Sequence, residues 1–269
     1  MGSLHSTPPS PYDGATSPAL AGEEMKDHSM EWTDRGIVLA SRAHGETGRV
    51  VSLLTRDHGR HAGFVHGGAS RKARPVWQSG NLVEVEWRAR LAEQLGTFTG
   101  ELREPHAANA LDDAVELAGL AAACAIVDAA LPEREPHPAV FDGFHAFLAV
   151  LGHAGWPVVY VKLELGLLQE LGFGLDLEKC AVSGATDDLA YVSPRTGRAV
   201  SRTAAEPYKE KLLPLPAFLI RDREKPGRDD LIAGLRLTGY FLDRHVFAHA
   251  VKPGATEARA RLIERLTAR

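Results

Sequence analysis

The chain has 269 residues, 44% of them hydrophobic and 25% charged, which is the balance of a globular protein with a sizeable core. Its formal net charge of -4 excludes attraction of the whole molecule to nucleic acid or to an anionic membrane, so such binding would require a local basic patch. The chain contains two cysteines, shows no secretory signal and has no window of about 18 uninterrupted apolar residues. We therefore predict a cytoplasmic protein without a disulfide framework and without a membrane-spanning helix.

Residues 1–30 form the first predicted segment. They contain Pro8, Pro9, Pro11 and Pro18 among serine, glycine and threonine residues, and they show no apolar periodicity. A segment of this composition buries too little surface to offset the entropy of ordering, so we predict a disordered N-terminal extension. Met30 immediately precedes the first strand-like run, which leaves open whether residues 1–29 belong to the native chain.

Residues 31–106 are predicted to form a β domain. Glycine turns separate short runs that are rich in valine and leucine or that alternate between apolar and polar residues, at 36–44, 48–59, 59–67, 81–89 and 96–104. Five short strands in about 70 residues favour a small barrel, because closure removes exposed strand edges. Residues 32–105 carry 11 lysine and arginine residues against 8 aspartate and glutamate residues, so the predicted barrel is net basic.

Residues 107–252 are predicted to be mainly helical. Helical periodicity extends over residues 110–131, 137–155, 156–174 and 228–251, with Pro157 at the start of one helix. Residues 175–205 contain turns and short extended pieces, which are typical of a small inserted β-like module. Residues 253–269 are predicted to be a C-terminal helix or tail. The predicted fold class is therefore α+β and multidomain, with a five-stranded barrel followed by a helical domain that carries an insertion.

The standard catalytic signatures are absent from the sequence. There is no phosphate-binding P-loop, Leu177 stands where a dinucleotide fingerprint needs its third glycine, and no G-x-S-x-G motif occurs. His245 and His249 lie one helical turn apart without the glutamate of a zincin motif. We therefore predict no enzymatic activity, no cofactor and no metal. The histidines of "HGRHAGFVH", which lack carboxylate or thiolate partners at ligand spacing, are expected to make a strand edge weakly positive.

The stretch "VHGGASRKARPVW", residues 65–77, is the strongest candidate for binding. Arg71, Lys72 and Arg74 follow two glycines, and three cations in four positions cannot all be buried. Such a loop is either a solvated charge run or a contact for phosphates. Other basic residues lie at neighbouring turns, which in a small barrel can converge into a groove for a nucleic acid backbone. The candidate binding residues are Arg42, Arg49, Arg60, Arg71, Lys72, Arg74 and Arg88. Aromatic residues for stacking are few.

Residues 30–251 resemble the RecO family of recombination and repair mediators, in its α-proteobacterial form. The resemblance is carried by an opening strand followed by "HGE", "LLTRDHGR" and "GGASRKAR", and later by "LDLEKCAVSGATDDLAYVSPRTGRAVS", "EPY" and "KLLPLP". These motifs occur in the order and spacing of that family.

The resemblance implies a non-enzymatic protein with an oligonucleotide-binding (OB) barrel. Proteins of this family bind single- and double-stranded DNA, anneal complementary strands, and work with RecR to load RecA onto DNA covered by single-strand-binding protein. They also bind the acidic tail of single-strand-binding protein through the helical domain. A cytoplasmic, nucleoid-associated location is implied as well. The DNA-facing positions carried over by the resemblance are Arg42, Arg49, Arg60, Arg71, Lys72 and Arg74.

The inserted module departs from part of the family. Some RecO proteins hold zinc with four cysteines in the inserted module, whereas this chain keeps Cys180 and has Ser183 and Ser201 instead of further thiols. A structural zinc site needs about four nitrogen or sulfur ligands, so we predict a metal-free module held by packing, around residues such as Leu189, Tyr191 and Val200.

A second hypothesis also fits the sequence. The balanced overall charge and the few aromatic residues are compatible with a protein-interaction scaffold whose barrel has no direct role on DNA.

Overall fold

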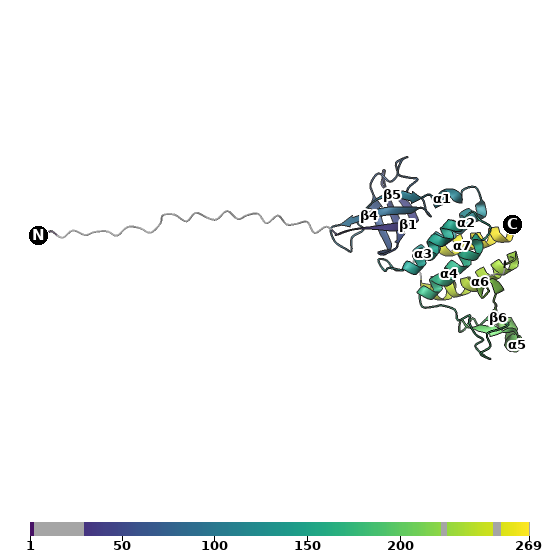
Figure 1. Ribbon diagram of the computed structural model, residues 1–269. Coiled ribbons are helices and arrows are strands. Elements are labelled where there is room, and N and C mark those ends of the chain that lie inside the picture. The colour runs from purple at the N-terminus through teal and green to yellow at the C-terminus, as the bar shows by residue number, and fades with distance from the viewer. Residues whose placement is uncertain (3–29, 222–224, 250–253, 269) are drawn as a thin grey trace.

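The computed structural model describes residues 1–2, 30–221, 225–249 and 254–268 (Figure 1). The predicted disordered extension lies outside the described residues, except at its ends. The strands are β1 (Met30–His44), β2 (Gly48–Thr55), β3 (Gly59–Val65), β4 (Leu82–Ala89), β5 (Thr97–Glu104), β6 (Leu189–Val192), β7 (Ala199–Ser201) and β8 (Leu213–Pro214). The helices are α1 (His106–Asn109), α2 (Ala114–Ala130), α3 (Pro138–Val150), α4 (Trp156–Glu170), α5 (Arg202–Ala205), α6 (Arg228–His245) and α7 (Ala255–Ala268), with short 3-10 helices η1 (Glu206–Lys211), η2 (Ala217–Leu219) and η3 (Phe247–His249).

Strands β1 to β5 form a closed barrel in the order β1-β2-β3-β5-β4, and β4 pairs with β1 to complete it. All neighbouring strands are antiparallel except β3 and β5, which are parallel. This strand order and these directions are those of an OB-fold. The predicted five-stranded barrel is confirmed. Strand β1 begins at Met30, earlier than the pattern predicts, because Trp32 turns inward and stacks on Trp87 at 5.6 Å.

The barrel interior is filled by apolar side chains from every strand and from the loop between β3 and β4. Its buried members are Val38, Val51, Leu53, Val65, Trp77, Val83, Val85, Trp87, Ala89 and Phe98. Gly63 lies beneath the ring of Phe98, where an added Cβ would come within 2.5 Å of that ring, so this strand position requires glycine.

The helical domain has a second apolar core, shared by α2, α3, α4, α6 and α7. Asp113 caps α2, because its carboxylate accepts hydrogen bonds from the backbone nitrogens of Val115 and Glu116. Helix α7 packs along α2 (Figure 1). Among the helices that the structure describes, none has the length and apolar character to cross a bilayer.

The two cores meet where α2 lies against β1 and β2. Outer residues of the barrel, Ile37, Leu39, Leu54 and Leu82, are buried in the helical core rather than in the barrel interior. Asn81 also joins the parts, since its Oδ1 accepts from Ala107 N at 3.0 Å and its Nδ2 donates to the Pro75 carbonyl at 2.8 Å. The barrel, the β3–β4 loop and the start of the helical domain are therefore held together by shared apolar burial and by buried hydrogen bonds.

The inserted module is a three-stranded sheet in the order β7-β6-β8, at the opposite end of the helical domain from the barrel (Figure 1). It includes Leu213–Pro214, which lie beyond residue 205. Leu189 and Val200 are buried, and Tyr191 packs against the same core. The buried sulfur of Cys180 accepts hydrogen bonds from the backbone nitrogens of Ser183 at 3.5 Å and Ser201 at 3.3 Å.

Candidate nucleic-acid interface

Residues 66–81, which we call the basic loop, connect β3 to β4 and are fixed to the barrel at both ends. Near the start, Ala69 N donates to the carbonyl of Thr47 in the β1–β2 turn at 3.0 Å. Near the end, Gly80 N donates to the Val38 carbonyl at 2.7 Å. Between them the indole of Trp77 is buried in the barrel core. The loop is therefore held in place by the barrel, although it contains no helix or strand.

Inside the basic loop, the backbone forms successive turns, and the side chains of its three cations are exposed to solvent. Arg74 N donates to the Ser70 carbonyl at 2.9 Å, and Ala73 N donates to the Ser70 hydroxyl at 3.2 Å. Arg71, Lys72 and Arg74 are exposed. Within the described ranges, none of the three forms an ion pair with a carboxylate. The loop thus offers three uncompensated positive charges on a fixed backbone, which suits phosphate binding.

Arg49 lies beneath the basic loop. It is half-buried, and its guanidinium donates from Nε to the hydroxyl of Ser41 and from Nη2 to the Ser41 carbonyl, both at 2.6 Å. A Cβ added to Gly68 of the loop would lie 3.2 Å from Cγ of Arg49, so the loop backbone rests on this side chain. These contacts give Arg49 a role in supporting the loop.

Arg60 lies in the domain junction, not on the exposed barrel surface that the sequence predicts for it. It is 7% exposed, and its Nε donates to the Leu131 carbonyl at 2.8 Å. Its Nη1 contacts Glu133 at 3.1 Å and Asp128 at 3.6 Å. Because the helical domain covers this guanidinium and satisfies its donors, we leave Arg60 out of the candidate interface.

Arg88 is exposed but already paired. Its Nε lies 3.1 Å from Oε2 of Glu31 and also contacts Glu86 on its own strand. Two carboxylates beside one guanidinium leave no excess positive charge, so Arg88 is a weaker phosphate contact than the cations of the basic loop.

Arg42 projects from the outer face of β1 toward the helical domain. It lines a hollow of about 270 Å³, together with Asp128 on α2 and Arg261 on α7. Ser79 of the basic loop lines the same hollow. Arg42 therefore adjoins one end of the loop, and Arg261 adds a cation that the sequence did not single out.

One aromatic side chain lies on the outside of the barrel. Trp77, Trp87 and Phe98 are core residues, whereas Phe64 is half-buried on β3, with its ring 5.7 Å from that of His44 and 4.7 Å from that of His66. A Cβ on Gly48 would approach the Phe64 ring to 2.2 Å, so the ring lies directly over β2. Strand alternation, which turns Gly63 and Val65 inward, could have placed Phe64 outside.

His61 does not contribute positive charge. It is 3% exposed inside the barrel, with its ring 4.8 Å from that of Trp87 and 5.1 Å from that of Trp32. Burial, followed by the nearby charges of Arg134 and His58, lowers the pKa of His61 to about 4. The expected weakly positive strand edge is thus wrong at this position, because His61 is an uncharged core residue at neutral pH.

Two family models match the chain. The model described as "Recombination protein O N terminal" matches residues 30–106, and the one described as "Recombination protein O C terminal" matches residues 111–252. The chain belongs to the RecO family. The RecO relatives include a protein of Rhodospirillum centenum, 56% identical over 88% of this chain and 94% of the relative, and one of Phenylobacterium zucineum, 52% identical over 88% and 98%. Both relatives carry the name DNA repair protein RecO.

Proposed function

We propose that this protein is a DNA-binding mediator of recombinational repair that acts without catalysing a reaction. The observation that carries the proposal is the basic loop, whose three exposed cations have no carboxylate partner among the described residues and stand on a backbone tied to an OB-type barrel. The RecO relatives, named DNA repair proteins, support the same role.

The proposed contact with DNA is electrostatic. Arg71, Lys72 and Arg74 bind phosphates, and Arg42 with Arg261 extends the positive surface toward the helical domain. Phosphate contacts position a strand without reading bases, so binding has no sequence preference. Phe64 supplies a ring on which one unpaired base can stack, which favours single strands over duplex.

The mediator role includes further steps. We propose that the protein binds single- and double-stranded DNA, anneals complementary strands and, with RecR, assists the loading of RecA onto DNA covered by single-strand-binding protein. Annealing requires two strands to approach in spite of their mutual repulsion. A surface of fixed, unpaired cations lowers that repulsion, which is the physical link between the basic loop and annealing.

The proposed site for the acidic tail of single-strand-binding protein is a hollow of about 500 Å³ in the helical domain. Apolar side chains of α2, α4, α6 and α7 line it, including Val115, Trp156, Ile232 and Leu266, and Arg228 stands in its wall. An apolar hollow beside a guanidinium suits a peptide that ends in an aromatic residue and carries carboxylates. Glu116 also lines the hollow, so the carboxylates of the tail are proposed to lie on the side of Arg228.

The test is a titration of a fluorescent single strand with the full chain at two salt concentrations. We expect the combined variant Arg71→Ala, Lys72→Ala, Arg74→Ala to bind at least about tenfold more weakly, with a salt slope that is smaller by about 2, since each lost contact removes about 0.7. Arg88→Ala, an exposed arginine already paired with carboxylates, is the matched control and should bind like wild type. Equal affinities and slopes for the combined variant and wild type would contradict the proposal and favour the scaffold hypothesis.

A further inference from the structure

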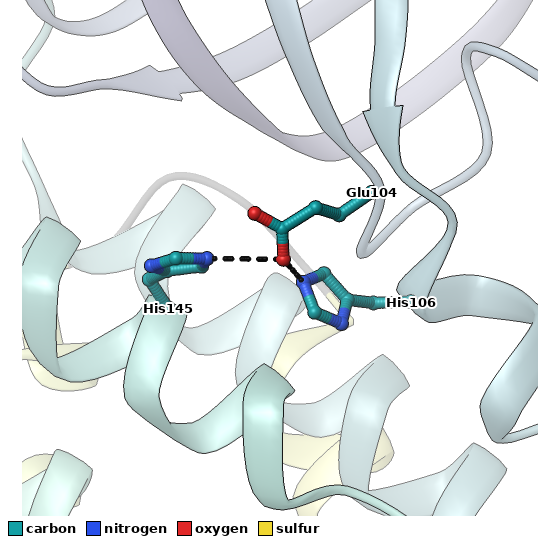
Figure 2. A group of neighbouring side chains, drawn as sticks. All are labelled: Glu104, His106 and His145. Atoms are coloured by element: carbon teal, nitrogen blue, oxygen red, sulfur yellow. Dashed lines mark hydrogen bonds and ion pairs between the residues drawn. The ribbon is translucent and has the colours of Figure 1, made fainter.

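Glu104, His106 and His145 converge at the junction of the two domains (Figure 2). Glu104 ends β5, and His106 begins α1 two residues later, whereas His145 comes from α3 in the helical domain. Figure 2 shows the carboxylate of Glu104 between the two imidazole rings, each of which turns a nitrogen toward it. The three side chains thus unite segments that lie 41 residues apart in sequence, one from each domain.

The ligand atoms have the spacing of a metal site. Oε2 of Glu104 lies 2.9 Å from Nε2 of His106 and 3.4 Å from Nε2 of His145, and all three atoms lie within 4.8 Å of one another. Zinc–nitrogen and zinc–oxygen bonds of about 2.1 Å at tetrahedral angles place neighbouring ligand atoms about 3.4 Å apart. Small side-chain adjustments would bring the three atoms to that separation.

The buried nitrogen of His106 gives independent support. His106 is 7% exposed, and its Nε2 forms an ion pair with the Glu104 carboxylate at 2.9 Å, although the contact lacks the alignment of a hydrogen bond. The carboxylate oxygen therefore lies to one side of the ring's lone-pair axis. Two ligands of a common ion have this arrangement, because each lone pair points at the ion and not at the other ligand.

We propose that Glu104, His106 and His145 bind a divalent transition metal ion of the zinc type. Two imidazoles and one carboxylate form a donor set that zinc accepts, with a fourth position open to water. The ion would tie the end of β5 and the start of α1 to α3, and so act as a structural clamp between the barrel and the helical domain. This inference departs from the metal-free prediction made from sequence, which rested on the cysteine-poor inserted module and on histidine runs elsewhere.

The test uses the full chain, freed of metal with a chelator, and zinc itself as the probe. Calorimetric titration of wild type is expected to give one zinc per chain, and His145→Gln and Glu104→Gln are each expected to bind on the order of tenfold more weakly or worse. His145 is partly exposed, so its substitution is compatible with folding, which circular dichroism verifies. Zinc should also raise the midpoint of thermal unfolding of wild type and leave that of His145→Gln unchanged.

Two control variants separate this site from other zinc-binding groups. His137→Gln removes one imidazole from a simple pair, in which His137 Nδ1 lies 3.0 Å from Glu170, and should retain wild-type zinc affinity. Cys180→Ser removes the thiol of the inserted module and should also retain it. The proposal is overturned if wild type binds zinc no more tightly than His145→Gln, or if Cys180→Ser abolishes binding while His145→Gln retains it.

Discussion

Arg259 on α7 donates from Nε to Oε1 of Glu164 on α4 at 2.8 Å, and from Nη2 to Oε2 at 3.0 Å. Both side chains are buried, and the hydroxyl of Thr238 on α6 donates to the same carboxylate. Because three helices share this bidentate pair, their relative positions depend on it.

The first prediction concerns this pair. Arg259→Met leaves the carboxylate of Glu164 buried without its cation, and we expect the free energy of unfolding in urea to fall by about 3–5 kcal/mol. Arg261→Met, an exposed arginine of the same helix, is the matched control and should change it by less than about 0.5 kcal/mol. The double variant Glu164→Met, Arg259→Met should recover much of the loss, because no buried charge remains. Similar losses of unfolding free energy for Arg259→Met and Arg261→Met would contradict the prediction.

The second prediction compares two arginines that cross the domain junction. Arg60 is buried between Asp128 and Glu133, whereas Arg56 makes an exposed pair with Asp142 at 3.3 Å. We expect Arg60→Ala to lower the free energy of unfolding by about 3 kcal/mol and Arg56→Ala to lower it by less than about 1 kcal/mol. Denaturant titration of both variants measures the difference. Single-strand affinity of folded Arg60→Ala should match wild type, and a large loss would return Arg60 to the DNA-binding surface.

The third prediction tests Phe64 as a stacking surface. Phe64→Ala should weaken binding to a single strand by about 1–3 kcal/mol and leave duplex binding nearly unchanged, because duplex bases present no free face. Phe173→Ala is the control, since Phe173 is exposed and stacks on His245 at 4.6 Å, away from the barrel. Equal losses on single strand and duplex would show that Phe64 supports the barrel and does not contact bases.

The fourth prediction concerns the pH dependence of stability. The pKa of His61 is about 4 in the folded protein, below the value of about 6.5 in an unfolded chain, so the unfolded state binds more protons between these values. The contribution of neutral His61 to the free energy of unfolding is therefore fully present above pH 6.5. It is lost as the pH falls toward 4, by an amount on the order of 3 kcal/mol. Urea unfolding of wild type and His61→Leu between pH 7.5 and pH 4.5 measures it. Identical pH slopes for the two proteins would refute the assignment.

Several parts of the fold could be predicted because local pattern determines them. Alternation in residues 81–89 reflects the two faces of β4, and the stripe on α6 that includes Leu235 and Leu242 reflects one buried helix face. The exposure of Arg71 and Lys72 followed from the cost of burying charges.

Contacts between residues far apart in the chain could not be predicted from local pattern. Arg60 faces outward from β3, as alternation predicts, but the carbonyl that satisfies it is that of Leu131, 71 residues later. His106 and His145 have no common local motif, so their approach to Glu104 emerges only when α3 packs beside the barrel. Sequence pattern identifies which face of a strand points out, and it does not identify what covers that face.

The position of α7 has a consequence for biosynthesis. The barrel is complete in sequence by Glu104, so it can fold while the rest of the chain is still being translated. The helical domain cannot finish in the same way, because Leu262 fills its core and Arg259 neutralises Glu164 only after α7 has left the ribosome. Nascent chains that stop before Ala255 would expose the apolar flank of α2 together with an uncompensated carboxylate. A premature stop codon at or shortly before the start of α7 would therefore give a chain with a folded barrel and an incompletely folded helical domain. We expect chaperones and proteases to bind such a chain.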